Sequence, residues 1–201
     1  MNFLGKYALY ILTGLGVIVA VWLIVGWTTM PLMWHTSALM FIAIVLHLWE
    51  EQRLPGGFTH MISEKIGFTQ VNPHFGDLVL MMLVILVGLG PLFFPAVIFL
   101  QLAPLILGMA EALAHTVTIL LFKMKRPYTP GMATAVFVML PISITGIVLG
   151  YQHNLIAGLD WLWAVLFMFG SVIICQFTVV RVSGVRYRDF LKGVVGNLRN
   201  S

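Results

Sequence analysis

The sequence predicts an all-α, polytopic membrane protein, a bundle of about six transmembrane helices with both chain ends in the cytoplasm. Of its 201 residues, 60% are hydrophobic and only 9% are charged, whereas a soluble domain carries about a quarter charged residues. The apolar residues also form long blocks, and about 20 such residues in a helix cross the hydrocarbon core of a bilayer. A third observation, the distribution of the basic residues, sets the orientation.

Six apolar blocks define the predicted spans. They cover residues 7–27, 31–49, 77–94, 96–122, 132–151 and 161–180. The third and fourth blocks are nearly fused, and Pro91 and Pro95 mark the turn between them because proline ends or kinks a helix. The first block is too long for the apolar region of a signal peptide and has no small-residue cleavage site, so it is interpreted as a retained helix.

The basic residues test both the number of spans and their direction. All eleven Lys and Arg residues fall at the N-terminus, in the second–third and fourth–fifth loops, or in the tail. The three opposite loops contain none, and five or seven spans would break this partition. The positive-inside rule places the basic side in the cytoplasm, and we expect the cytoplasmic (plasma) membrane of a bacterium. The net charge of +4 comes from these loops and does not indicate a nucleic-acid partner.

Two regions follow from this pattern. Residues 1–180 form the predicted transmembrane domain, with a motif-bearing core of about 31–150. Residues 181–201 form a basic tail whose apolar residues share approximately one helical face, which is typical of a helix lying on an anionic leaflet. The lipid bilayer is the first expected partner, and the oligomeric state stays open.

Ionisable residues within the spans gather at one predicted depth. His47, Glu50 and Glu51 lie at the cytoplasmic end of the second span, where the i, i+3, i+4 spacing places them on one helical face. Glu111 and His115 lie at i, i+4 in the cytoplasmic half of the fourth span. Each charged group at the centre of a membrane segment costs roughly 2.5–3.5 kcal/mol even on the lenient insertion scale, so such groups indicate function or a buried pair.

The second–third loop adds candidates on the same side of the membrane. His60 and Glu64 are spaced i, i+4, and His74 and Asp77 follow. Apolar residues of the segment 58–66 predict a short interfacial helix over the cluster. These four polar residues are possible additional members of the site.

Three interpretations of the cluster compete. The first is a metal site with His47, Glu50, Glu111 and His115 as ligands, because facing helices hold zinc, or two iron or manganese ions, with histidines and carboxylates at this spacing. Glu51 would then support the ligands or act as general base. The second is a metal-free acid–base site in which two glutamates share a proton. The third is a proton or cation pathway, and the structural alternative is that the pairs only satisfy each other.

Two motifs carry a family resemblance: HLWEE at residues 47–51 and YTPG at residues 128–131. In this order they resemble the HXXEE family of membrane proteins, which is described by a His-x-x-Glu-Glu motif, a further histidine and a Tyr-x-Pro-Gly motif. His115 is the best candidate for the further histidine, ahead of His60 or His74. The resemblance covers roughly the second to fifth spans and implies no assigned reaction.

The YTPG motif can also be interpreted from its residues alone, without the family resemblance. It follows a basic loop, so Tyr128 and Arg126 are predicted to bind an anionic substrate head; the alternative is a turn beside a basic anchor. The functional hypothesis is a metal-dependent enzyme, a hydrolase acting on a lipid or other amphiphilic small molecule at the cytoplasmic leaflet, with Glu51, Glu50 and His47 as catalytic candidates. A proton- or cation-coupled transporter and a metal-free acid–base enzyme are the alternatives.

Overall fold

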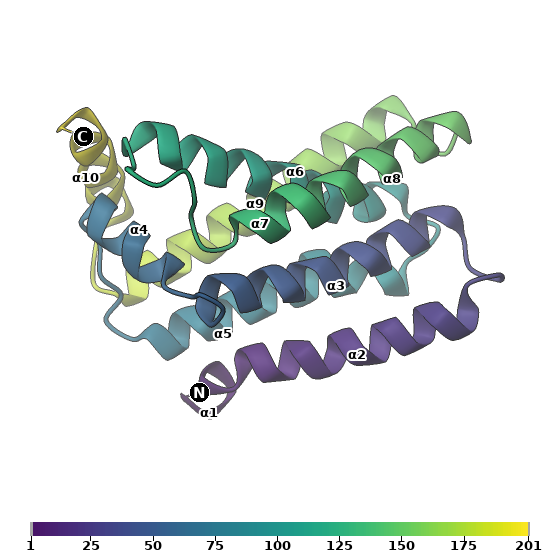
Figure 1. Ribbon diagram of the computed structural model, residues 1–201, viewed down its shortest axis with the longest axis horizontal. Coiled ribbons are helices and arrows are strands. Elements are labelled where there is room, and N and C mark those ends of the chain that lie inside the picture. The colour runs from purple at the N-terminus through teal and green to yellow at the C-terminus, as the bar shows by residue number, and fades with distance from the viewer. Residues whose placement is uncertain (1, 201) are drawn as a thin grey trace.

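The computed structural model describes residues 2–200 and the side chains of residues 3–197, and this part of the chain is helical without a strand (Figure 1). Within these described residues, six spans are long and apolar enough to cross a membrane: Ala8–Gly26, Leu32–Gln52, Pro73–Phe93, Ile98–Leu121, Met132–Gln152 and Gly158–Val182. The predicted fold class and number of spans are therefore confirmed. The span boundaries differ from the predicted blocks by a few residues.

Four of the spans are single helices, and two are composite. The single helices are α2 (Ala8–Gly26), α3 (Leu32–Gln52), α6 (Ile98–Leu121) and α9 (Gly158–Val182). The third span joins α5 (Pro73–Val84), the π-helical η1 (Ile85–Leu89) and the 3₁₀-helical η2 (Gly90–Phe93), and the fifth joins α7 (Met132–Thr134), the π-helical η3 (Ala135–Met139) and α8 (Leu140–Gln152). Short helices α1 (Asn2–Lys6), α4 (Phe58–Ile66) and α10 (Tyr187–Asn200) complete the described chain.

The predicted turn between the third and fourth spans is stabilised by a buried amide. The side chain of Gln101 in α6 is fully buried. Its Nε2 donates to the carbonyl oxygens of Pro91 at 2.6 Å and Phe94 at 3.2 Å. These carbonyls have left the regular helix, and an unpaired backbone carbonyl inside a membrane is costly. Gln101 thus has a structural role.

Helix α3 is the centre of the bundle. It packs against α2, α6 and α8, and 67% of its spanning window is buried, against 22–39% for the other five spans. A Cβ atom on Gly108 of α6 would lie 2.5 Å from Ser143 Oγ and 2.7 Å from Met40 Cε. The glycine therefore lets α6 approach α3 and α8 closely, and the two spans that carry the predicted cluster are in contact.

Both described chain ends lie at the same end of the bundle, together with α4 and α10 (Figure 1). We call this the site end. The predicted loop helix is present as α4, which contacts α10, and the Phe68 ring beside it packs against Phe190 of α10 with 5.1 Å between ring centroids. The predicted tail thus contains a helix, and its last residue, Ser201, lies outside the described residues.

Candidate metal centre

Three ionisable side chains converge at the site end. His47 and Glu51 lie on the last turns of α3, and His115 lies on the facing side of α6. Glu51 Oε1 is 3.6 Å from His47 Nε2 and 3.5 Å from His115 Nε2, and the three potential ligand atoms all lie within 4.8 Å of one another. Two ligand atoms on a tetrahedral zinc ion are about 3.4 Å apart, from bond lengths near 2.0–2.1 Å. The group therefore has the spacing of a metal site.

The opposite nitrogen of each histidine ring is already engaged. His47 Nδ1 lies 3.0 Å from the Gly131 carbonyl oxygen. A carbonyl oxygen only accepts, so Nδ1 carries the hydrogen of this bond and Nε2 of the neutral ring presents its lone pair to Glu51. His115 Nδ1 lies 2.7 Å from Thr129 Oγ1, which can accept in the same way. Metal-binding histidines are commonly oriented by such a bond from the second nitrogen.

His115 is the most enclosed of the three residues. It is fully buried, and the Phe58 ring of α4 covers it with 4.7 Å between centroids. Its Nε2 has no hydrogen-bond partner among the residues that the structure describes. A buried polar atom is normally paired. The Glu51 carboxylate faces this nitrogen at 3.5 Å without a hydrogen bond, and an ion held between the two groups would satisfy both.

Gly131 allows the three side chains to meet. It has a φ of 97°, in the left-handed region that favours glycine. A Cβ atom at this position would lie 2.7 Å from Glu51 Cγ and 2.8 Å from Cε1 of both His115 and His47. The glycine of the YTPG motif is therefore the residue around which the cluster packs.

Glu50 is turned away from this cluster and joins α3 to the start of the fifth span. Its Oε1 accepts from Tyr128 OH at 2.8 Å and from the Ala133 amide at 3.0 Å. Its Oε2 accepts from the amide of Thr134 at 2.7 Å and from its hydroxyl at 2.6 Å. A carboxylate at a helix N-terminus binds otherwise unpaired N–H groups and favours the positive end of the helix dipole. We call these contacts the Glu50 anchor.

The two residues expected at a substrate mouth lie apart from the cluster. The Tyr128 hydroxyl is committed to the Glu50 anchor, and burial, reinforced by the adjacent carboxylate, raises the pKa of Tyr128 to about 12. The phenol therefore stays a neutral donor at physiological pH. Arg126 is exposed in the loop before it. Neither residue lines the cavity beside Glu51.

The remaining predicted residues occupy three further places. Glu111 on α6 borders the cluster, with Oε2 3.9 Å from His47 Nε2 and a side chain that is 33% exposed. His60 and Glu64 pair with each other on the exposed face of α4 at 3.7 Å. His74 and Asp77 pair at 3.7 Å near the start of α5. Of the four ligands predicted from the sequence, the two histidines belong to the converging group. The carboxylate of this group is that of Glu51 and not that of Glu50, and Glu111 lies at the edge of the group.

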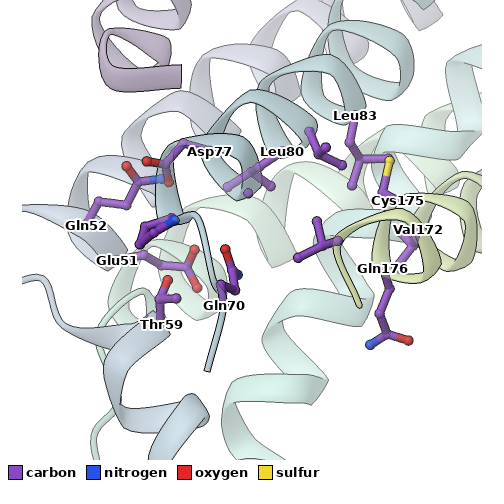
Figure 2. A pocket seen from close by; sticks show the side chains of 14 residues that line it. Glu51, Gln52, Thr59, Gln70, Asp77, Leu80, Leu83, Val172, Cys175 and Gln176 are labelled. Carbon is purple, nitrogen blue, oxygen red and sulfur yellow. The ribbon is translucent and has the colours of Figure 1, made fainter. Parts of the chain in front are cut away.

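Several polar residues around the cluster were missed by sequence reasoning. Thr129 and Thr134 bond the two histidines and Glu50, and their one signal was proximity to the YTPG motif. Gln176 in the sixth span lines a cavity of about 400 Å³ beside Glu51 (Figure 2). An amide within an apolar span was a signal that could have identified it.

The fold and the site define a multi-pass α-helical membrane protein with a buried histidine–glutamate cluster at one end of the bundle. A family model described as protein of unknown function with HXXEE motif matches residues 38–145, which is more than half of the chain. The protein therefore belongs to this family. The matched segment contains all of the converging residues and the whole YTPG motif. No curated protein and no solved structure matches the chain.

Proposed function

We propose that this protein is an intramembrane metalloenzyme that holds one divalent ion, zinc, with His47, Glu51 and His115. The observation that carries the proposal is the buried Nε2 of His115, which lacks a hydrogen-bond partner among the described residues and faces the same Glu51 oxygen as His47 Nε2. Two histidines and one carboxylate with an open fourth position form a ligand set of zinc hydrolases. A dinuclear iron or manganese centre draws on more carboxylates than converge here.

The proposed reaction is hydrolysis. When bound, the ion would act as a Lewis acid and lower the pKa of a water molecule. Glu111 lies at the edge of the cluster and is partly exposed, which supports a role for it as the base that would take the proton from that water and pass it to the leaving group. In the hydrolysis of an ester or amide, the water oxygen bonds to the acyl carbon, the bond to the leaving oxygen or nitrogen breaks, and the leaving atom gains the proton.

The position of the cluster supports an amphiphilic substrate. His47 and His115 belong to two membrane-spanning helices, near their ends at the site end. The basic loops lie at this end, which the positive-inside rule assigns to the cytoplasm. A site at this depth is reached by molecules that partition into the bilayer. We therefore assign the proposed activity to a lipid or related amphiphile of the cytoplasmic leaflet.

Metal content tests the proposal. Protein purified without chelators should contain stoichiometric zinc by mass spectrometry, and Glu51→Gln and His115→Ala should lose it. His60→Ala is the matched control, because this histidine pairs with Glu64 outside the cluster. A folded wild-type protein that contains no metal and binds none on addition would overturn the metalloenzyme. Ion-dependent flux in liposomes by such a protein would support the transporter, and ester hydrolysis by it would support acid–base catalysis.

A further inference from the structure

A cavity connects the candidate metal centre to the space between α5 and α9. It has a volume of about 400 Å³. Figure 2 shows Glu51, Thr59 and Gln70 at one end of it and Leu83, Val172 and Cys175 at the other. Its polar end is therefore next to the converging ligands, and its apolar end lies between two spanning helices.

A second cavity continues the first. It has a volume of about 560 Å³ and shares the lining residues Val79, Leu83 and Cys175 with the first cavity. Its other lining residues come from the following turns of α5 and η1 and from α9: Met82, Ile85, Leu86 and Thr178. From Val79 to Leu86 the groove follows about 10 Å of helix axis at 1.5 Å per residue. Together the two cavities form one groove with a polar and an apolar end, which we call the α5–α9 groove.

The polar end of the groove is uncharged or acidic in character. It is lined by two carboxylates, two amides and one hydroxyl: Glu51, Asp77, Gln52, Gln70 and Thr59. Among the side chains described there, none is a lysine or arginine. Amides both donate and accept hydrogen bonds, whereas carboxylates repel an anionic head. A divalent ion on Glu51 would be balanced by the carboxylates of Glu51 and Asp77. His74 and Arg53, which act on Asp77, do not line the cavity.

We propose that the α5–α9 groove binds the hydrocarbon chain of a single-chain amphiphile whose uncharged head, an ester or amide bearing hydroxyl groups, lies against Glu51 and the amides of Gln52 and Gln70. This inference rests on the proposed function for the reaction that follows binding, and it names the substrate class. An apolar groove within a bilayer is filled by lipid chains wherever it occurs. The continuity of this one with a polar cavity at the cluster selects a chain that carries a hydrogen-bonding head.

Photo-crosslinking in nanodiscs of neutral lipid tests this assignment. The probe is a monoacylglycerol with a diazirine in the middle of its chain, and crosslinked peptides are identified by mass spectrometry. We expect enrichment in residues 79–86 and 172–179, with competition by unlabelled monoacylglycerol. Lysophosphatidate of the same chain length should compete poorly, because its phosphate meets carboxylates. Equal competition by lysophosphatidate would overturn the preference for an uncharged head.

Variants separate the groove from general lipid contact. Leu83→Trp fills the part shared by both cavities and should lower crosslinking at least about tenfold, because two buried methylenes already contribute that factor. Cys175→Phe fills the same part and serves if Leu83→Trp does not fold. Ile174→Trp is the matched control, since its side chain is 67% exposed and lines neither cavity. Crosslinks spread over all lipid-facing helices and unchanged by the filling variants would overturn the proposal.

The metal-free His115→Ala variant keeps the two proposals distinguishable. His115 lines neither cavity, so crosslinking in the groove should persist in this variant. Groove crosslinking without metal in the wild-type protein would refute the metalloenzyme and leave the binding groove. Stoichiometric metal without groove crosslinking would refute the groove and leave the metal centre.

Discussion

Substitution of Gly131 by alanine is the sharpest perturbation of the candidate metal centre. An L side chain at its φ of 97° costs about 1–2 kcal/mol of folding free energy. The added Cβ would also lie 2.7–2.8 Å from one carbon atom each of Glu51, His115 and His47. Real Cβ atoms do not approach other carbons so closely, so the three side chains must move apart.

Gly57→Ala provides a control that separates backbone strain from displacement of the ligands. Gly57 has a φ of 91°, and no atom of the described residues lies within 4 Å of the Cβ position. We expect both variants to lose about 1–2 kcal/mol of unfolding free energy from backbone strain. Gly131→Ala should in addition bind zinc about 10- to 100-fold more weakly, the range seen when groups that orient metal ligands are changed. This equals about 1.4–2.8 kcal/mol of binding free energy.

The assay is competition for zinc with a metal-binding dye, run on detergent-purified protein beside thermal unfolding of the same samples. A folded Gly131→Ala protein with wild-type zinc affinity would refute the reasoning, because the three side chains would then bind zinc without the packing described. Equal weakening by Gly57→Ala would show that strain near the site, and not contact with the ligands, controls metal affinity.

The Glu50 anchor and metal binding give two more predictions. Tyr128→Phe removes one hydrogen bond to Glu50 and should lower the unfolding free energy by about 1–2 kcal/mol, with metal content unchanged. Because the pKa of Tyr128 is raised from its ordinary value to about 12, denaturant titrations should show this difference in full below a pH of about 10. The difference should be lost as the pH rises through about 12; no difference at neutral pH would contradict the anchor. Chelation should lower the melting temperature of the wild-type protein, and zinc at 100 times its Kd should restore about 2.7 kcal/mol. His115→Ala should show neither shift, and a wild-type melting temperature insensitive to both treatments would count against a bound metal.

The two adjacent glutamates of the HXXEE motif have different structural roles, because they point in different directions from the helix. His47 and Glu51, one helical turn apart, face α6 and His115. Glu50 is rotated by about 100° around the helix from Glu51 and faces residues 128–134. One glutamate thus belongs to the candidate centre, and the other holds the segment that carries Gly131 against it.

The sequence by itself determined the membrane fold and the location of the cluster. Apolar blocks of about 20 residues identify spans because their length must match the hydrocarbon thickness. The same constraint places His47 and His115 at a common depth once the direction of each span is known. The short helix α4 was also predictable, since its apolar residues recur with helical spacing.

Only the tertiary structure decided which residues meet. Residues at i+3 and i+4 lie on one broad helical face, so spacing alone could not separate Glu50 from Glu51. The distinction arises because Glu51 faces His115 of α6, whereas Glu50 faces the hydroxyl of Tyr128 and the amides of Ala133 and Thr134. Likewise, a Pro-Gly pair predicts a turn from local chemistry. The position of Gly131 among the three converging side chains depends instead on long-range contacts, such as the one with His47, which is 84 positions away in the chain. Local sequence does not encode such contacts, because they are set by how whole helices pack.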